Sequence, residues 1–153
     1  MATPAFIVRL MQHKGLSSTA CAKLGPEDAE AYRFAQDLRQ ASIEGRLLAV
    51  WTHPANELAG MGKTVNGKFR VAVQAAIAKA LGLITGSSDY LFLHQRGAIA
   101  MEFKAKDGSL TQGQRDFREW CNACGVPFHV VRSRTEAMDV LRNAGVLVEE
   151  RGW

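Results

Sequence analysis

Residues 86–104 read Gly86-Ser-Ser-Asp-Tyr-Leu-Phe-Leu-His94, then Gln95-Arg-Gly97, then Ala98-Ile-Ala-Met-Glu-Phe-Lys104. Two apolar runs are therefore separated by a short break that contains a glycine. This pattern predicts a β-hairpin, because two strand-forming runs joined by a glycine-containing turn tend to pair with each other. We expect the rest of the chain to pack around this pair of strands.

Side chains in the second run alternate between the two faces of the strand. Glu102 and Lys104 fall on one face, with Ala98 and Ala100, and the larger apolar side chains fall on the other. The face of Asp89 depends on the loop: a two-residue loop places it opposite Lys104, and a four-residue loop places it opposite Glu102. A three-residue loop turns Asp89 away unless a bulge restores the phase.

Asp89 and Glu102 together have the chemistry of a divalent metal site. Two carboxylates about 5 Å apart on adjacent strands repel each other unless a cation lies between them. Oxygen ligands suit Mg²⁺ or Mn²⁺, at roughly 2.1 Å. Lys104 beside such a metal would position a water and neutralise charge on a phosphate oxygen. These residue types predict hydrolysis of phosphodiester bonds.

The same residues resemble a known superfamily of nucleases. Asp89 followed by Glu102-Phe103-Lys104 is similar to the Asp…Glu-x-Lys core of the PD-(D/E)XK superfamily. Leu110-Thr-Gln-Gly-Gln114 stands where the VRR-NUC branch carries its Leu-Ser/Thr-x-x-Gln motif. Gly82-Leu-Ile-Thr-Gly86 and His53-Pro-Ala-Asn56 also resemble small stand-alone VRR-NUC proteins of phage genomes. The resemblance covers roughly residues 27–145.

The resemblance implies an α/β fold with a restriction-endonuclease-like core, in which helices flank a central mixed β-sheet. It implies that Asp89, Glu102 and the backbone carbonyl of Phe103 bind Mg²⁺ or Mn²⁺, and that Gln114 is the family's site glutamine. An acidic residue on the first helix assists at the metal in this family. Either Glu30 or Glu27 fits that position.

The implied activity is that of a metal-dependent DNA endonuclease. Family members of this size resemble junction resolvases that act as homodimers, so we expect branched or four-way junction DNA as the substrate. Ser88 replaces the proline that usually precedes the aspartate, and a proline would stiffen this approach. The alternative is a nuclease-like fold kept as a DNA-binding or interaction module without turnover. Retention of Asp89, Glu102 and Lys104 argues against that alternative.

Composition places the chain in the class of single globular domains. It has 153 residues, of which 47% are hydrophobic and 22% charged, enough to bury a sizeable core. Three cysteines without a signal peptide favour a reducing cytoplasm, in a bacterial or phage-infected cell. No apolar run is long enough to span a membrane. The net charge of +4 permits binding to a polyanion such as DNA.

Three segments follow from the pattern along the chain. We expect a partly ordered N-terminal arm over residues 1–24, a nuclease-like domain over 25–145, and a tail over 146–153 that docks on its own domain or on a second copy. Within the domain, the patterns predict helices near 26–42, 69–81, 109–124 and 135–143, a buried strand near 46–53, a flexible loop near 60–68, and a strand near 126–132.

Cationic and polar residues near these elements are candidates for contact with DNA. Gly60-Met-Gly-Lys63-Thr64 also resembles part of a phosphate loop, but the full motif needs glycine at position 57, which is Glu57. We therefore regard nucleotide binding as the weaker interpretation. The candidate nucleic-acid contacts are His53, Asn56, Lys63, Lys68, Arg70, Lys106, Arg115 and Arg118.

Overall fold

A computed structural model describes residues 2–55 and 61–153 of the chain. Its central sheet has the order β1-β4-β5-β6, formed by Ala49–Thr52, Tyr90–His94, Gly97–Phe103 and Phe128–Val131. The pairs β1–β4 and β4–β5 are antiparallel, whereas β5–β6 is parallel. The predicted mixed sheet of an α/β protein is therefore confirmed.

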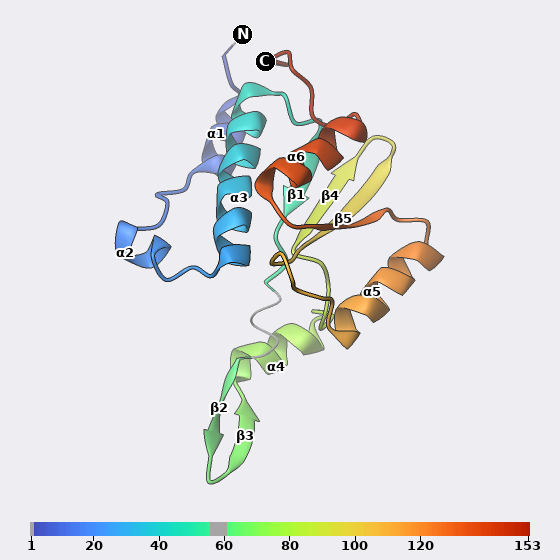
Figure 1. Cartoon of the computed structure of the whole chain (residues 1–153). Coiled ribbons are helices and arrows are strands. Elements are labelled where there is room, and N and C mark those ends of the chain that lie inside the picture. The colour runs from blue at the N-terminus through green and yellow to red at the C-terminus, as the bar shows by residue number, and fades with distance from the viewer. Residues whose placement is uncertain (1, 56–60) are drawn as a thin grey trace.

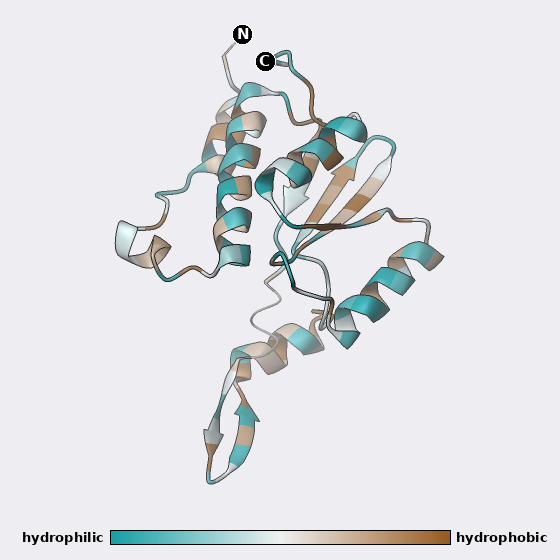
Figure 2. Cartoon of the chain, in the orientation of Figure 1, coloured by the Kyte–Doolittle hydropathy of each residue, from teal (hydrophilic) through white to brown (hydrophobic). Residues whose placement is uncertain are grey.

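Helices cover both faces of this sheet (Figure 1). Helix α3 (Pro26–Glu44) and helix α6 (Arg134–Asn143) pack on one face, and α5 (Gln112–Ala123) lies on the other. Figure 2 shows that the strands are largely apolar, whereas α5 presents mostly hydrophilic residues. Among the described helices, none combines the length and the apolar composition that a membrane span requires.

The core lies between β4–β5 and the α3–α6 layer. Phe34 and Leu38 of α3 are fully buried against Met101 and Phe103 of β5 and against Leu141 of α6. The apolar stripe predicted for the first helix is thus confirmed, and so is the predicted alternation in residues 98–104. Glu102 and Lys104 consequently point to the other face, toward α5.

The hairpin loop settles which residue lies opposite Asp89. His94 pairs with Gly97, so the loop consists of Gln95 and Arg96 alone. The pairing of Tyr90 with Met101 then brings Asp89 level with Glu102. The expectation that a two-residue loop would place Asp89 opposite Lys104 is wrong, because that register needs the loop to fall one residue later.

Residues 61–81 differ from the prediction. Gly62–Val65 (β2) and Lys68–Val71 (β3) form a separate antiparallel hairpin, and the helix α4 spans only Val73–Ala80. Asn66 and Gly67 both have positive φ, at 49° and 73°, which suits the tight turn of a two-residue hairpin. The predicted flexible loop and the predicted start of the helix at Phe69 are both wrong. Lys63 lies in a strand, not in a loop that leads into a helix, which removes the geometry of a phosphate loop.

The strand near residues 46–53 is also only half buried. As β1 it lies at the edge of the sheet, and Val50 is 71% exposed on the side away from α3. The prediction of a buried strand holds for one face only. Only the face of β1 that packs toward α3 needs apolar side chains, because the face that carries Val50 is largely exposed to solvent.

Both ends of the chain pack on the domain. Ala5–Met11 (α1) and Ser18–Cys21 (α2) form helices, and α1 packs beside α3. At the other end, Val146 and Leu147 are buried in the core. The Trp153 indole N–H donates to the Ser42 carbonyl at 3.0 Å. The C-terminal tail therefore docks on its own domain.

We predict that Gly86→Ala destabilises the fold much more than Gly82→Ala. Both residues have positive φ, at 90° and 110°, so each substitution has a conformational cost of about 1–2 kcal/mol. A Cβ on Gly86 would also lie 2.3 Å from the Gly113 carbonyl carbon, whereas a Cβ on Gly82 meets nothing within 4 Å. We expect a total loss of about 3–5 kcal/mol for Gly86→Ala, measured by urea unfolding. Equal losses in the two variants would contradict this packing.

Candidate active site

Glu102 is the most deeply buried ionisable side chain of the central sheet, at 1% exposure. Its carboxylate accepts three hydrogen bonds. Oε2 accepts from the Asp89 backbone N–H at 3.2 Å, and Oε1 accepts from Lys104 Nζ at 3.0 Å and from the Gln114 side-chain amide. Burial of a carboxylate is costly unless such donors surround it. The packing of α5 and of both hairpin strands therefore converges on this one group.

Asp89 lies one residue before β4 and completes a reciprocal pair of contacts. Its Oδ2 accepts a hydrogen bond from the Phe103 backbone N–H at 2.8 Å, while its own N–H donates to Glu102. In a strand the N–H and C=O of one residue point to the same side. The Phe103 carbonyl therefore lies on the same edge of β5 as the Asp89 carboxylate.

Gln114 reaches Glu102 because of the way α5 begins. Thr111 caps the helix: its hydroxyl accepts from the Gln114 N–H at 3.3 Å, and Gln114 Oε1 accepts from the Thr111 N–H at 2.9 Å. This capping box fixes the side chain of its third helical residue. The remaining amide N–H of Gln114 then points at Glu102. The Thr-x-x-Gln spacing is thus a helix cap that also aims a donor into the site.

Lys104 lies between two carboxylates. It is 8% exposed, and its Nζ is 3.0 Å from Glu102 and 3.9 Å from Glu27. Glu27 also accepts from the Ala105 N–H at 3.2 Å. Of the two acids proposed for the first helix, Glu27 therefore lies in the site.

Glu30 lies elsewhere. It accepts from the Arg134 backbone N–H at 2.7 Å and pairs with Arg33 at 2.9 Å. Glu30 joins α3 to the start of α6 and does not face the Glu102 carboxylate.

The backbone on either side of Asp89 is held by His53 and Ser88. His53 Nδ1 donates to the Asp89 carbonyl at 2.5 Å, and its ring packs on Tyr90. The Ser88 hydroxyl is fully buried and donates to the Tyr90 carbonyl at 3.2 Å. A side-chain hydrogen bond therefore restrains the backbone at the residue that precedes Asp89.

Arg132 is a part of this region that the sequence did not reveal. Its guanidinium donates to the carbonyls of Ala105, Lys106 and Gly108, and so braces the turn that follows Lys104. A lone arginine after a strand carries no motif, and its three acceptors are backbone atoms. Only the packed loop makes this contact recognisable.

The electrostatics of the cluster disfavour full ionisation of both acids. Burial, followed by the charge of Asp89, raises the pKa of Glu102 to about 7, although Lys104 opposes the shift. Burial also raises the pKa of Asp89, and Glu27 contributes to that rise. The single ammonium group of Lys104 thus does not fully offset the cost of burying these two carboxyl groups.

The donor set fits Mg²⁺ or Mn²⁺ by its chemistry, since it consists of oxygen ligands from Asp89, Glu102 and the Phe103 carbonyl. It is a small set. Within residues 2–55 and 61–153 no three His, Cys, Asp or Glu side chains converge closely enough to hold an ion by themselves. Lys104 lies between Glu27 and the Glu102 carboxylate. A cation bound by Asp89 and Glu102 would therefore keep several water ligands.

The remaining candidates for nucleic-acid contact fall into three groups. Arg115 donates to Leu110 and Gln112, and Arg118 pairs with Glu119 at 3.6 Å, so both have local partners. Lys106 is exposed on the turn beyond Lys104. The three cations of residues 63–70 lie on the β2–β3 hairpin, and Asn56 lies outside the described residues.

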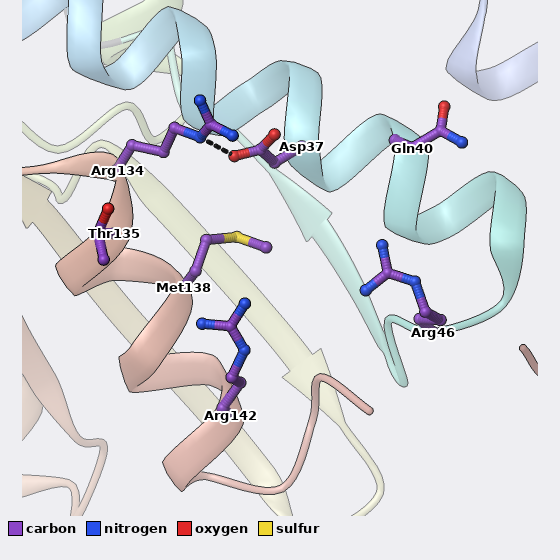
Figure 3. Close-up of a pocket in the computed structure, with 7 residues that line it drawn as sticks. All are labelled: Asp37, Gln40, Arg46, Arg134, Thr135, Met138 and Arg142. Atoms are coloured by element: carbon purple, nitrogen blue, oxygen red, sulfur yellow. Dashed lines mark hydrogen bonds and ion pairs between the residues drawn. The ribbon is translucent and has the colours of Figure 1, made fainter. Parts of the chain in front are cut away.

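A separate polar hollow of about 390 Å³ lies between α3 and α6 (Figure 3). It begins at Asp37, about 15 Å along the helix axis from Glu27, and each of its arginines is paired with an acid. Arg134 pairs with Asp37, Arg46 with Glu44, and Arg142 with Asp139. This pairing leaves no charge for a ligand, and the hollow is distinct from the Glu102 cluster.

Comparisons of the chain with known protein families, with curated proteins and with solved structures each find no match. The functional argument therefore depends on the geometry of the Glu102 cluster and on the residues that form it.

We predict that Glu102 makes the fold less stable as the pH rises. The pKa of Glu102 in the folded protein is about 7, above its ordinary value of 4.5. Its stabilising contribution is therefore full below the ordinary value of 4.5 and is lost as the pH rises through the folded pKa. The difference corresponds to roughly 3 kcal/mol. Urea unfolding of Glu102→Gln at about pH 5.5 and about pH 8.5 should show a smaller decline than the wild type. Glu30→Gln should behave like the wild type, and an unchanged decline in Glu102→Gln would contradict the assignment.

Proposed function

We propose that this chain is a metal-dependent endodeoxyribonuclease with a restriction-endonuclease-like core, of the VRR-NUC type. The observation that carries the proposal is the convergence of Asp89, Lys104 and Gln114 on the buried carboxylate of Glu102. A carboxylate pair beside an ammonium group and an amide suits the hydrolysis of a phosphodiester better than a structural role. A purely structural ion pair would not need the second acid or the aimed glutamine.

Each residue has a task in this mechanism. Asp89, Glu102 and the Phe103 carbonyl would hold the divalent cation, which would supply Lewis-acid polarisation of the phosphate and offset the negative charge that develops on it. Lys104 orients the attacking water and stabilises charge on the phosphate oxygen. Gln114 holds Glu102 in place, and Glu27 restrains the lysine from the opposite side.

The proposed substrate is DNA, and branched DNA is favoured by the resemblance to junction resolvases. Such enzymes cut two strands with two active sites, so we also propose a homodimer with a solution mass of twice 16.7 kDa. An exposed apolar row on the open face of the sheet supports a second copy. Val50 and Leu93 pair across β1 and β4 and are 71% and 61% exposed.

A protein that binds DNA without cutting it is the competing interpretation. Glu102 accepts hydrogen bonds from Lys104 and Gln114, and a protein that only binds DNA would also need these donors to bury the acid. The two interpretations differ in one respect: only the nuclease needs the deprotonated acids to take up a cation. Dependence of cleavage on Mg²⁺ therefore separates them.

We predict that the protein nicks plasmid and four-way junction DNA with Mg²⁺ and does not do so with EDTA. Asp89→Asn, Glu102→Gln and Lys104→Met should each reduce cleavage by at least about a hundredfold, while DNA binding measured by gel shift is retained. Glu27→Gln should reduce cleavage less than these three.

Glu30→Gln is the matched control and should cleave at the wild-type rate, since Glu30 contacts α6 instead of Lys104. Cleavage at the wild-type rate by any of the three central variants would remove the role given to that residue. Cleavage that persists in EDTA would contradict the metal-dependent mechanism.

A further inference from the structure

We propose that the β2–β3 hairpin is a DNA-binding arm, whose cationic face lies along the phosphate backbone of the duplex that enters the active site. The proposal rests on the proposed function and extends it. The sequence predicted a flexible loop that carries three candidate DNA-contacting cations, and the hairpin now gives these cations a common face and an orientation. The sorting of side chains on the hairpin carries the argument.

The hairpin has two chemically different faces. Lys63 lies directly opposite Arg70, and Lys68 is two residues before Arg70 on the same strand. Opposed residues and residues two apart share a face, so all three cations project to one side. Thr64 and Phe69, which pair with each other, project to the other side. The alternation of hydrophilic and apolar residues along β3 is visible in Figure 2.

The cationic face has no partner in the part of the chain that the structure describes. None of its three side chains forms an ion pair or a hydrogen bond with residues 2–55 or 61–153. Like charges placed directly opposite each other on neighbouring strands destabilise a hairpin. Lys63 and Arg70 form such a pair, and an external anion would relieve their repulsion.

The arm lies in a segment of the chain that carries positive charge and no acid. Residues 58–88 contain four cations, Lys63, Lys68, Arg70 and Lys79, and no acid. The rest of the chain has 15 cations and 15 acids, which balance. The hairpin itself carries three of these four cations, and Lys79 lies on α4. A polyanion would therefore be attracted to this acid-free segment.

The hairpin lies in the part of the sequence between two residues of the active site, His53 and Asp89. These two residues are joined by the hydrogen bond from His53 to the Asp89 carbonyl. Figure 1 shows the hairpin extending away from the central sheet. A nucleic acid bound along the arm would thus be tethered close in the chain to the residues that flank the Glu102 cluster.

The dimensions of a two-stranded ribbon suit duplex DNA. The major groove, about 12 Å wide, admits such a ribbon. Lys68 and Arg70 are separated by about 7 Å along their strand, which is close to the rise of two base pairs, about 3.4 Å each, along the DNA helix axis. An anionic membrane surface could also attract three cations, but it would not explain why the arm lies in the chain between two residues that flank an acid cluster suited to phosphodiester chemistry.

The test measures binding of the full chain to a fluorescein-labelled DNA duplex by anisotropy, in EDTA, over a series of sodium chloride concentrations. The combined substitutions Lys63→Ala, Lys68→Ala and Arg70→Ala should weaken binding by at least about tenfold and reduce the salt slope by about 2.7, which is about 0.9 per lost phosphate contact. Lys79→Ala removes a cation from α4 instead of the hairpin and should leave the slope unchanged.

A second variant tests the face directly. The pair Lys63→Thr and Thr64→Lys keeps the composition and the net charge but moves one cation to the other face. It should reduce the salt slope as much as Lys63→Ala does, by about 0.9. Full binding by the swapped variant would overturn the assigned face.

The remaining outcomes separate this proposal from the nuclease assignment. If the triple variant binds DNA as tightly as the wild-type protein does, the proposed role of the arm is overturned and the nuclease assignment stays intact. Wild-type protein that binds no DNA overturns both. Binding to phosphatidylserine vesicles that needs the three cations, with DNA binding unaffected by them, would assign the arm to membranes and overturn the proposal.

Discussion

Burial of the Glu102 carboxylate is the constraint on which the arrangement of this protein depends. A charged oxygen inside a protein needs donors, and each donor to Glu102 comes from a different part of the fold: the approach to β4, the end of β5 and the first turn of α5. These three parts are held in register by one group. The raised pKa of Glu102, about 7, indicates that the donors do not fully offset the cost of burial. A buried acid with a strongly perturbed pKa in such a cluster marks a candidate functional site.

The same constraint connects the acid cluster to the hairpin arm. The long excursion of the chain between β1 and β4 leaves the sheet after His53 and returns at Asp89, and these residues contact each other beside Glu102. The segment that carries the net positive charge is thus attached at the point where negative charge is buried. In the proposed complex, the arm would hold the DNA backbone while the acids and their cation act on one phosphate.

Local patterns in the sequence were sufficient where the structure is locally determined. Alternation along residues 98–104 correctly placed Glu102 and Lys104 on one face, since the period of a strand needs no tertiary information. The register of the hairpin was not predictable, because a shift of one residue in the loop changes the partner of Asp89. The sequence could not choose between Glu27 and Glu30 either, since both face the sheet side of one helix and only the position of α6 separates them.

The β2–β3 hairpin was missed for a different reason. Asn66-Gly67 is a strong turn signal, but the alanine-rich residues that follow favoured a helix that began too early. Short exposed strands bury little surface, so their apolar pattern is weak compared with that of a core strand. Arg132 was missed because its acceptors are backbone carbonyls, which no pattern of side chains can reveal.

The most direct test of the central claim is a crystal structure of the protein grown with Mn²⁺, with anomalous diffraction used to locate the ion. We expect an anomalous peak bounded by the Asp89 carboxylate, the Glu102 carboxylate and the Phe103 carbonyl, with Lys104 adjacent to it. A map at full Mn²⁺ loading with no peak at these oxygens, and with Glu102 still bonded only to its protein donors, would contradict the claim.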